Sequence, residues 1–331
     1  MERSIKVIGT GIYIPKTVVT AEELDKKLSL PSGWTLKKSG VRVRHFITNE
    51  TASKMGAKAA VQAVENAGIR LEDIDCIISG SGTMEQPIPC NAALIQKELS
   101  LEESGIPCFD INTTCLSFVK GFDLASYLID SGRYKTILIV SSEISSIGLN
   151  WKQKESAVLF GDGAAAVVVQ KPRKEESSHI LTARMETYSV GASHSEIPGG
   201  GTKIHPREHA HLSEEHFLFQ MNGQAIFRLS SRLLPAFMEK LFAGTNITMN
   251  ALKAVIPHQA SGMALRILQK KLNIPDAVFI NNIENYGNTI AASIPIALHE
   301  AIEQGRIKRG DLVMLIGTSA GLSIGGVIFE Y

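Results

Sequence analysis

Three residues of this 331-residue chain have types and surroundings suited to thiol chemistry: a cysteine, a histidine and an asparagine. Cys115 ends the strand-like run CFDINTTC, and the following run, LSFVKGFDLASYLIDSG, has helical periodicity. The cysteine is therefore predicted to lie at a strand-to-helix turn. Because unpaired N–H groups and the helix dipole stabilise a thiolate at such a turn, we expect a lowered pKa for Cys115 and a nucleophilic sulfur.

The other two residues belong to the second half of the chain. His258, in VIPHQAS, follows a short strand-like run, and the carboxyl ends of strands are where open α/β proteins form their sites. Counting back 17 residues from Gly132 reaches Cys115, and the same count from Gly305 reaches Asn288 in NYGNTIAAS. Cys115 and Asn288 are thus expected at equivalent helix starts, and the three side chains are expected to converge.

The elements that would position these side chains occur twice. AALIQKEL (92–99) and LRILQKKL (265–272) are separated by 173 residues, and both halves contain a long buried-strand run, TILIVSSE (136–143) and DLVMLIGTSA (311–320). The apolar runs CIIS, AVLF, AAVVVQ and LVMLIG lack alternation, which is typical of strands covered on both faces. We therefore predict an α/β protein of two duplicated, layered halves with a site at their junction.

A polar stretch separates the two halves. We predict an N-terminal half over 1–172, a polar surface excursion or lid over 173–216, and a C-terminal half over 217–331. Four histidines lie close in sequence in the excursion, but no carboxylate or cysteine completes a familiar ligand set, so solvated loop histidines are favoured and no metal is expected. They are His205, His209, His211 and His216.

The composition argues against a nucleic-acid-binding, secreted or membrane-spanning protein. Lys+Arg total 34 and Asp+Glu total 33, and this balance argues against nucleic acid as a partner. The first residues, MERSIKVIGTG, lack the apolar core of a secretory leader, and no uncharged apolar stretch approaches the roughly 18 residues of a membrane span. The expectation is a soluble cytoplasmic protein with free thiols and no membrane association.

Two other kinds of site fit part of the pattern and fail on context. Cysteine, histidine and asparagine in this order also occur in thiol proteases, but the local CG[SA]C[WY] signature is absent. The run Gly161-Asp162-Gly163 approximates a dinucleotide fingerprint, in which the glycines must open a helix. Here the run continues into AAVVVQ, which reads as a strand, so we expect no nicotinamide cofactor.

Taken together, the motifs VIGTGIYIPK, SGVRVRH, DINTTC, VLFGDGAAAVVV, PHQAS and NYGNTIAASIP resemble ketoacyl-acyl-carrier-protein synthase III and its relatives over essentially the whole chain. The resemblance implies a thiolase-like fold in αβαβα layers, a homodimer, and no cofactor beyond coenzyme A or acyl-carrier-protein thioesters as substrates. It also implies acyl-thioester condensation, in fatty-acid or specialised-metabolite synthesis, with Cys115, His258 and Asn288 as the triad.

The residue types then suggest roles within that reaction. The Cys115 thiolate would take the acyl group from a thioester, while the backbone N–H groups of Cys115 and Ala320 hold the tetrahedral oxyanion. Decarboxylation of a malonyl-type thioester would give an enolate, to which His258 and Asn288 donate hydrogen bonds. A neutral amide suits this role, because a carboxylate would repel the enolate.

The resemblance also implies binding roles for individual residues outside the triad. Two lysines stand where the family has arginines that bind coenzyme A, so the charge is kept without the planar fork and a looser grip is expected. Met263 replaces an arginine of the carrier-docking patch, with Arg266 three residues later as the expected substitute. The positions are Trp34, Lys38 and Lys154 for coenzyme A, Ile88, Met221 and Phe227 for the acyl pocket and tunnel, and Arg228, Arg266, Lys270 and Lys271 for an acidic carrier protein.

Some departures from the family pattern point to a specialised paralogue. Ile88, which would line the partner subunit's acyl pocket, is smaller than an aromatic residue, and the contexts TTCLSF and GTSAGLSIGG are unusual. Two rival hypotheses remain open. One is non-decarboxylative condensation or acyl transfer to oxygen or nitrogen, for which Glu85 is the candidate base. The other is a catalytically silent partner subunit, which would have no need of all three triad residues.

Overall fold

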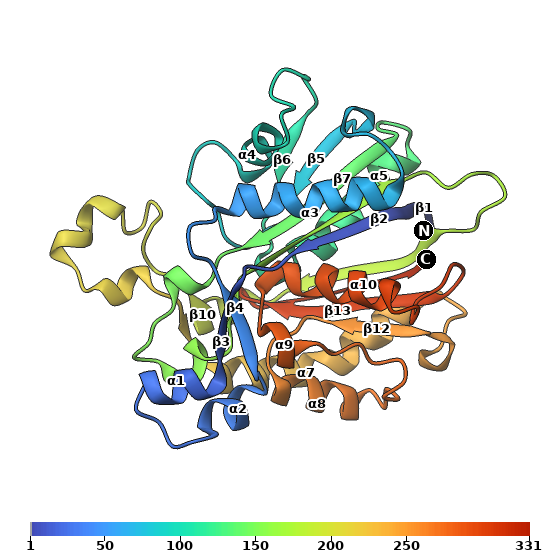
Figure 1. Cartoon of the computed structure of the whole chain (residues 1–331). Coiled ribbons are helices and arrows are strands. Elements are labelled where there is room, and N and C mark those ends of the chain that lie inside the picture. The colour runs from blue at the N-terminus through green and yellow to red at the C-terminus, as the bar shows by residue number, and fades with distance from the viewer. Residues whose placement is uncertain (1) are drawn as a thin grey trace.

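Two five-stranded sheets form the framework of the chain, which the computed structural model describes from residue 2 to residue 331 (Figure 1). The first sheet has the order β2-β8-β7-β5-β6 and the second β1-β9-β14-β13-β12. The strands are β1 (Arg3–Ser4), β2 (Lys6–Tyr13), β3 (Thr17–Thr20), β4 (Val43–Phe46), β5 (Cys76–Ser79), β6 (Cys108–Asp110), β7 (Thr136–Glu143), β8 (Gly163–Gln170), β9 (His179–Thr187), β10 (Ser195–Glu196), β11 (Gln220–Met221), β12 (Ala254–Pro257), β13 (Leu312–Ser319) and β14 (Ser323–Glu330).

Ten α-helices and eight 3₁₀ turns connect the strands in the described part of the chain. The helices are α1 (Ala21–Lys27), α2 (Trp34–Ser39), α3 (Ala52–Ala67), α4 (Asn91–Glu98), α5 (Ser117–Asp130), α6 (Lys154–Ala157), α7 (Gly223–Phe242), α8 (Gly262–Lys271), α9 (Ile283–Tyr286) and α10 (Ser293–Glu303). The 3₁₀ turns are Leu71–Asp73, Thr114–Leu116, Ser146–Gly148, Ser189–His194, Pro206–His211, Glu214–Phe217, Met249–Ala251 and Ile290–Ala292.

The sheets match strand for strand, which confirms the predicted duplication. β2, β8, β7 and β5 correspond in order to β9, β14, β13 and β12. In each half the two long central strands pair antiparallel, and the next strand joins them in parallel. Edge strands β6 and β1 are additions, one to each sheet.

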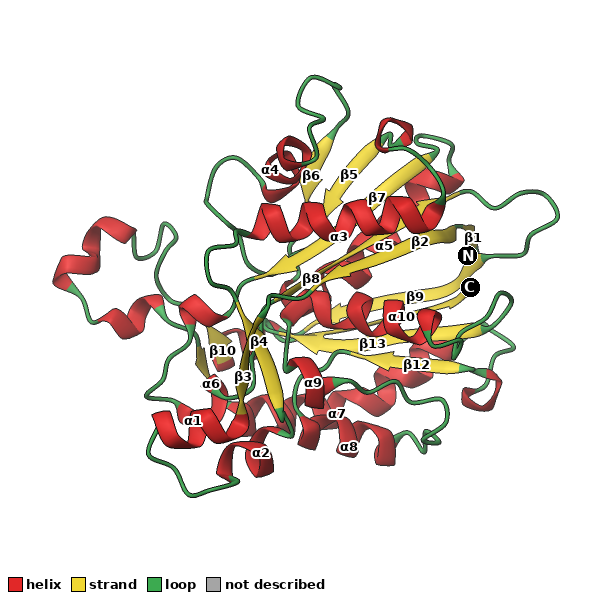
Figure 2. Cartoon of the chain, viewed as in Figure 1, coloured by secondary structure: helices red, strands yellow, loops and turns green. Residues whose placement is uncertain are grey.

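Both faces of each central strand are buried, and this explains the unbroken apolar runs. On β7, Ile137 faces the core between the sheets while Leu138 faces α3 and α4. On β13, Val313 faces the same central core while Met314 faces α7 and α8. Because α5 and α10 lie between the sheets, the layers are αβαβα, as predicted (Figure 2).

The predicted excursion over 173–216 is wrong for its first part. Residues 179–187 form β9, an internal strand of the second sheet, between β1 and β14. Its polar residues misled the prediction, because Arg184 and Glu186 pair with each other on the outer side while Ala183 and Met185 pack against the core. The second half therefore begins at β9, and the excursion proper follows it as the projecting yellow loop in Figure 1.

The apolar run AVLF is not the strand that its composition predicts. α6 ends at Ala157, and Phe160 makes only an isolated bridge with Asn288. The run is apolar because it is buried against Trp151 and Phe219. Its composition therefore indicates a buried segment and does not identify a strand. The strand predicted after it, AAVVVQ, is confirmed as part of β8, which supports the rejection of a dinucleotide fingerprint.

None of the helices between residues 2 and 331 combines the length and the apolar run that crossing a bilayer requires.

Candidate active site

Cys115 lies at the predicted strand-to-helix turn, in the 3₁₀ turn Thr114–Leu116 directly before α5. Ser117, the first residue of α5, fixes the turn, because its hydroxyl oxygen accepts from the Thr113 N–H at 2.9 Å and its hydroxyl donates to the Thr114 carbonyl at 2.6 Å. Thr114 has a φ of 51°, a left-handed conformation that is unfavourable for a β-branched residue. Backbone strain of this kind gathers at functional sites.

The protonation of Cys115 differs from the expectation. Burial raises the pKa of the thiol to about 12, and the charge of Glu143 adds to this effect. The N–H groups of Cys115 and Ala320 act in the opposite direction, because they hydrogen-bond the sulfur. The prediction of a lowered pKa from the helix N-terminus is therefore wrong: desolvation outweighs the N–H groups, and the resting thiol is neutral near pH 7.

The same two N–H groups are the ones predicted for an oxyanion site. Both are directed at the sulfur, Cys115 from the 3₁₀ turn before α5 and Ala320 from the turn between β13 and β14. Thr114 Oγ1 lies 3.5 Å from the Ala320 carbonyl oxygen, which it reaches as a weak donor. A carbonyl carbon bonded to the sulfur would place its oxygen close to this pair of donors.

His258 follows β12 at the end of the second sheet and is 6% exposed. Its Nδ1 lies 2.8 Å from the Ser293 hydroxyl at the start of α10, and that hydroxyl oxygen also accepts from the Gln259 N–H at 3.3 Å. The serine proton is then free to donate to Nδ1, which leaves the hydrogen on Nε2. Burial lowers the pKa of His258 to about 4, so the imidazole is neutral at pH 7.

A glycine allows the histidine and the cysteine turn to approach each other. A Cβ placed on Gly317 would lie 2.7 Å from the Cβ of His258 and 3.2 Å from Cδ2 of Leu116. Leu116 is the residue after the cysteine, so His258 and the Cys115 turn pack against the same point of β13. Any side chain at position 317 would push them apart.

Asn288 is held by the backbone on one side and by the histidine loop on the other. Its N–H donates to the Leu159 carbonyl at 2.8 Å, and its side-chain Nδ2 donates to the Ala260 carbonyl at 3.4 Å. Ala260 is two residues after His258, so the asparagine side chain reaches the loop that carries the imidazole. Its Oδ1 accepts from the Ile290 N–H at 2.9 Å, which fixes the amide orientation.

Asn288 is not, however, the structural counterpart of Cys115. Ser117 and Ser293 begin the equivalent helices α5 and α10, so Cys115 corresponds to Ala291. α10 has 11 residues and α5 has 14, and a count back from the closing glycines therefore overshoots by three. The predicted convergence holds all the same, because the two 3₁₀ turns contact each other across the junction of the halves.

The predicted coenzyme A residues gather on neighbouring elements. Trp34 and Lys38 lie on α2, with the Lys38 ammonium 5.8 Å from the indole centre and 2.9 Å from Glu155 of α6. Lys154, also on α6, donates to the Leu28 carbonyl at 3.2 Å. α2 ends against the start of α8, the helix that follows the histidine loop and lines the pocket that contains His258.

The predicted tunnel residues lie at different depths. Phe227, on the second turn of α7, is 42% exposed and lines a pocket of about 90 Å³ together with His258 and Ala260. Met221 does not line this pocket. It packs with Phe160 and Phe219 near α6.

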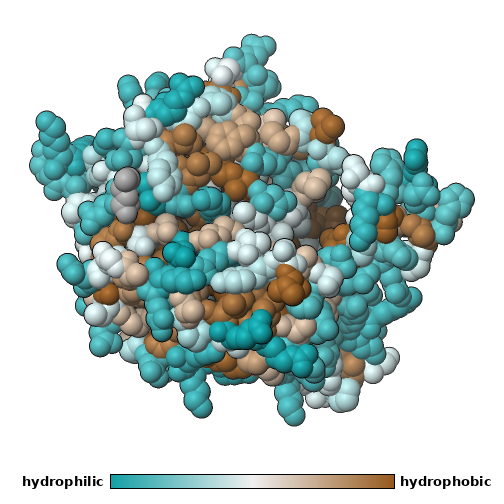
Figure 3. Space-filling model, turned by 180° about the vertical axis from the view of Figure 1, so that it is seen from behind, coloured by the Kyte–Doolittle hydropathy of each residue, from teal (hydrophilic) through white to brown (hydrophobic). Residues whose placement is uncertain are grey.

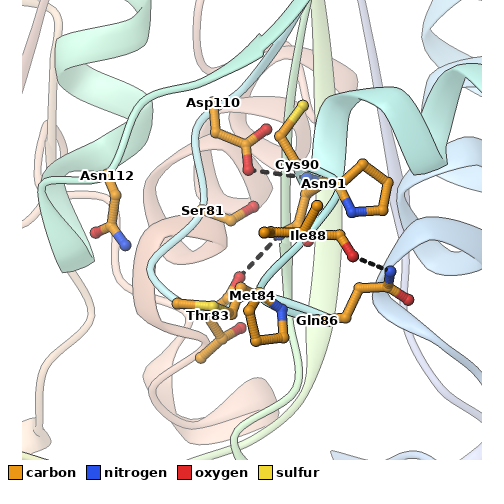
Figure 4. Close-up of a pocket in the computed structure, with 11 residues that line it drawn as sticks. Ser81, Thr83, Met84, Gln86, Ile88, Cys90, Asn91, Asp110 and Asn112 are labelled. Carbon is orange, nitrogen blue, oxygen red and sulfur yellow. Dashed lines mark hydrogen bonds between the residues drawn. The ribbon is translucent and has the colours of Figure 1, made fainter. Parts of the chain in front are cut away.

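Ile88 belongs to a separate pocket near the edge strand β6. The pocket has a volume of about 230 Å³ and lies between the loop after β5 and the end of β6, where Asp110 and Asn112 line it (Figure 4). Ile88 is 84% exposed there. Glu85, in the same loop, is not among the lining residues, and its carboxylate accepts from the Ser53 N–H of α3 at 2.7 Å.

The predicted carrier patch lies on α7 and α8. All four cations are exposed, and the Lys271 ammonium donates to the Ser231 carbonyl, which ties the end of α8 to α7. Met263 and Arg266 are both exposed on α8, as the substitution of one position for the other requires. The four residues are Arg228 on α7 and Arg266, Lys270 and Lys271 on α8.

Three of the four excursion histidines are exposed, and His209 contacts the Phe217 ring. Within residues 2–331, no three histidine, cysteine or carboxylate side chains are gathered as a metal site would need.

Two further residues near the site were not predicted from the sequence. Ser293 orients His258, and Glu143 is a fully buried carboxylate behind the cysteine turn. The signal for Glu143 was available, because TILIVSSE ends a buried apolar run in a charged residue. Ser293 has no such signal, since serine is common at helix starts.

Comparison with known proteins gives matches over the whole length of the chain. The family model described as 3-oxoacyl-[acyl-carrier-protein] synthase III matches residues 109–189, and the model of its C-terminal part matches residues 242–331. The beta-ketoacyl-[acyl-carrier-protein] synthase III of Aquifex aeolicus is 35% identical over 326 residues, covering 98% of this chain and 99% of the relative. That of Vesicomyosocius okutanii is 33% identical, with 100% of both chains covered.

A solved structure agrees with these relatives. The crystal structure of the Aquifex aeolicus synthase superimposes with a TM-score of 0.88 at 34% identity, over 99% of this chain and 100% of the other.

Proposed function

We propose a two-stage reaction for this chain, which belongs to the beta-ketoacyl-[acyl-carrier-protein] synthase III family and is a condensing acyltransferase. In the first stage an acyl group moves from a thioester to Cys115. In the second stage a malonyl-type thioester loses carbon dioxide and takes the acyl group as a carbon nucleophile. The chemistry assigned to the protein's own residues needs no metal or resident cofactor.

In the loading stage, the Cys115 sulfur forms a bond to the carbonyl carbon of the donor. The oxygen becomes negative and is met by the N–H groups of Cys115 and Ala320, which hydrogen-bond the sulfur in the free enzyme. The carbon–sulfur bond to the donor then breaks, and the donor thiol leaves with the proton that Cys115 gives up. The neutral His258 ring carries its hydrogen on Nε2 and accepts from Ser293 at Nδ1, so it has no free lone pair for that proton, which passes to the departing sulfur.

In the condensation stage, loss of carbon dioxide from the extender leaves an enolate. The Nε2–H of His258 and the Nδ2–H of Asn288 are the donors proposed for its oxygen. The enolate carbon then bonds to the acyl carbon, the bond to Cys115 breaks, and a β-ketoacyl thioester is released. The observation that carries this proposal is the junction itself, where Gly317 lets the His258 loop and the Cys115 turn meet.

The decisive experiment is mass spectrometry of the protein after incubation with a panel of acyl thioesters. An adduct on Cys115 would identify the donor and its chain length. Absence of any adduct would favour the silent-subunit hypothesis.

Carbon dioxide release from a malonyl thioester separates decarboxylative condensation from its rival. We expect release in proportion to product. Product without release would favour the non-decarboxylative reaction. The candidate base for that reaction is Glu85, whose carboxylate already accepts a hydrogen bond from the Ser53 N–H at the N-terminus of α3. This contact favours the decarboxylative proposal.

Trp34 is proposed to stack on the adenine of a coenzyme A donor. Replacing Trp34 by alanine is expected to raise the KM for an acyl-coenzyme A donor about tenfold, because stacking of a base on an aromatic ring contributes about 1–3 kcal/mol. The kcat should be unchanged, since Trp34 lies on α2 and belongs to neither the Cys115 turn nor the His258 loop. Steady-state kinetics check this, with Leu36→Ala, an exposed position on the same helix, as the control. An unchanged KM would contradict the assignment.

The cations on α7 and α8 are proposed to dock an acidic carrier protein. Replacing Lys270 and Arg266 by glutamate is expected to raise the KM for carrier-bound extender about tenfold at low salt, because each reversal turns attraction into repulsion. The KM for coenzyme A thioesters should not change. Lys253→Glu, at an exposed position outside the patch, is the control. Equal effects on both kinds of thioester would contradict carrier docking.

We propose a homodimer that acts in the cytoplasm. The exposed Ile88 near the β6 edge supports the dimer, as do the apolar patches on the face seen in Figure 3. The four free cysteines fit a reducing compartment. Sedimentation velocity at micromolar concentration tests the dimer, and a single species of monomer mass would contradict it.

A further inference from the structure

Glu143 is a charged residue sealed inside the protein beside the catalytic turn. It is the last residue of β7 and is 0% exposed. Its carboxylate accepts four hydrogen bonds from uncharged donors: the Gly82 N–H at 2.6 Å, the Thr83 N–H at 2.9 Å, the Thr83 hydroxyl at 2.6 Å and the Ala291 N–H at 3.3 Å. A fully buried carboxylate without a cation is costly, so its retention calls for an explanation.

The four donors come from both halves of the molecule. Gly82 and Thr83 lie in the loop after β5, whereas Ala291 is the second-half counterpart of Cys115. The carboxylate therefore joins the halves directly behind the site.

The loop after β5, which is hydrogen-bonded to Glu143, packs against the two turns that contain Thr114 and Ile290. A Cβ on Gly82 would lie 2.9 Å from Cγ2 of Ile290 and 3.3 Å from Cα of Thr114. Thr114 and Ile290 have φ values of 51° and 49° and occupy equivalent places before Cys115 and Ala291. Strain of this kind persists only where the surroundings enforce it.

We propose that Glu143 is a positioning residue: its carboxylate locks the two strained turns together, and its charge adds to the burial that keeps Cys115 protonated until a donor is bound. The second part rests on the proposed role of Cys115 as nucleophile. A protonated thiol is protected from oxidation and alkylation between turnovers, because the thiolate is the reactive form.

The electrostatics agree with this geometry. Burial raises the pKa of Glu143 to about 7, and its charge acts on the Cys115 thiol. Other carboxylates on neighbouring elements are engaged elsewhere: Asp162 accepts from the Ser145 and Ser146 N–H groups, and Glu85 accepts from the N-terminus of α3. His258, across the junction, is neutral.

The effect of Glu143 on Cys115 depends on pH. Below about pH 7 Glu143 is protonated and exerts no charge on the thiol, whereas above that pH its charge opposes the thiolate. Replacing Glu143 by glutamine removes the charge at every pH.

Alkylation of Cys115 by iodoacetamide tests the proposal, with the modified peptide quantified by mass spectrometry between pH 5.5 and 9.5. We expect Glu143→Gln to react about tenfold faster than the unchanged protein above pH 7.5, because one pKa unit changes the thiolate fraction about tenfold. The two rates should converge below pH 6. Glu85→Gln, which removes a carboxylate of the neighbouring loop, should follow the unchanged protein throughout. Equal profiles for Glu143→Gln and the unchanged protein would overturn the charge effect.

A second variant tests the positioning part and covers a failure of Glu143→Gln to fold. Glu143→Asp keeps the charge and shortens the side chain, so its alkylation profile should match the unchanged protein while acylation by a thioester donor slows about tenfold. Acylation at the unchanged rate would overturn the positioning role. If the unchanged protein itself accepts no acyl group, the proposed function fails, but the alkylation comparison still decides whether Glu143 controls the thiol.

Discussion

Replacing Cys115 by serine is expected to lower the rate of β-ketoacyl product formation by at least about 10⁴-fold. A serine hydroxyl is a far weaker nucleophile than a thiol, and it is also a much weaker acid, so its proton is harder to remove. The loss should appear in kcat, because the substitution leaves in place the residues proposed to bind the donor, such as Trp34. Pre-steady-state mass spectrometry should detect no acyl adduct on the variant.

Cys108→Ser is the matched control for this prediction. Cys108 is a free, half-buried cysteine on β6, and it lines neither pocket. Activity within about twofold of the unchanged protein is expected, with a similar melting temperature for both variants, since each exchange alters a single atom. Substantial product formation by Cys115→Ser would contradict the nucleophile assignment.

The sequence predicted the architecture well because its signals were strong and local. Unbroken apolar runs such as residues 136–143 indicate strands covered on both faces, and their repetition predicts duplicated halves. The turn at Cys115 could also be predicted, since helical periodicity begins directly after it. β9 was missed because its exposed side carries polar residues such as Arg184.

The electrostatics of the site could not be predicted in the same way. The helix N-terminus at Cys115 is visible in the sequence, but the burial of the sulfur and the effect of the Glu143 charge on it are not. Both properties arise where residues 82–83, the Cys115 turn, Glu143 and Ala291 meet. Each of these segments is more than 25 residues from the next, so they come together only in the folded chain. The pairing of Cys115 with Asn288 failed for a related reason, because helix lengths differ between the halves.

His258 and Asn288 are expected to separate the two stages of the reaction. Asn288→Asp is nearly the same size, and its oxygen can still accept from the Ile290 N–H. The second oxygen would meet the Ala260 carbonyl and the enolate, and both contacts are repulsive where the amide donates. We expect condensation to slow about 10²- to 10³-fold, as for loss of an oxyanion donor, while Cys115 still accepts the acyl group.

Quenched-flow mass spectrometry should therefore show the acyl-enzyme accumulating in Asn288→Asp. Asn285→Asp introduces the same charge three residues away on the exposed side of α9 and should turn over normally. If Asn288→Asp blocked acylation as strongly as condensation, Asn288 would belong to the loading stage instead.

The pH profile of condensation tests His258 independently. Since burial lowers the pKa of His258 to about 4, the imidazole stays neutral, with Nε2–H as its donor, from pH 8 down to about pH 5. In Glu143→Gln, which lacks the carboxyl whose pKa is raised to about 7, we expect single-turnover condensation from a preformed acyl-enzyme to be flat over that range and to fall only as the pH approaches 4. A midpoint near 6.5 would mean that His258 is solvated as an ordinary histidine is, and that the sealed junction of the halves does not set its protonation.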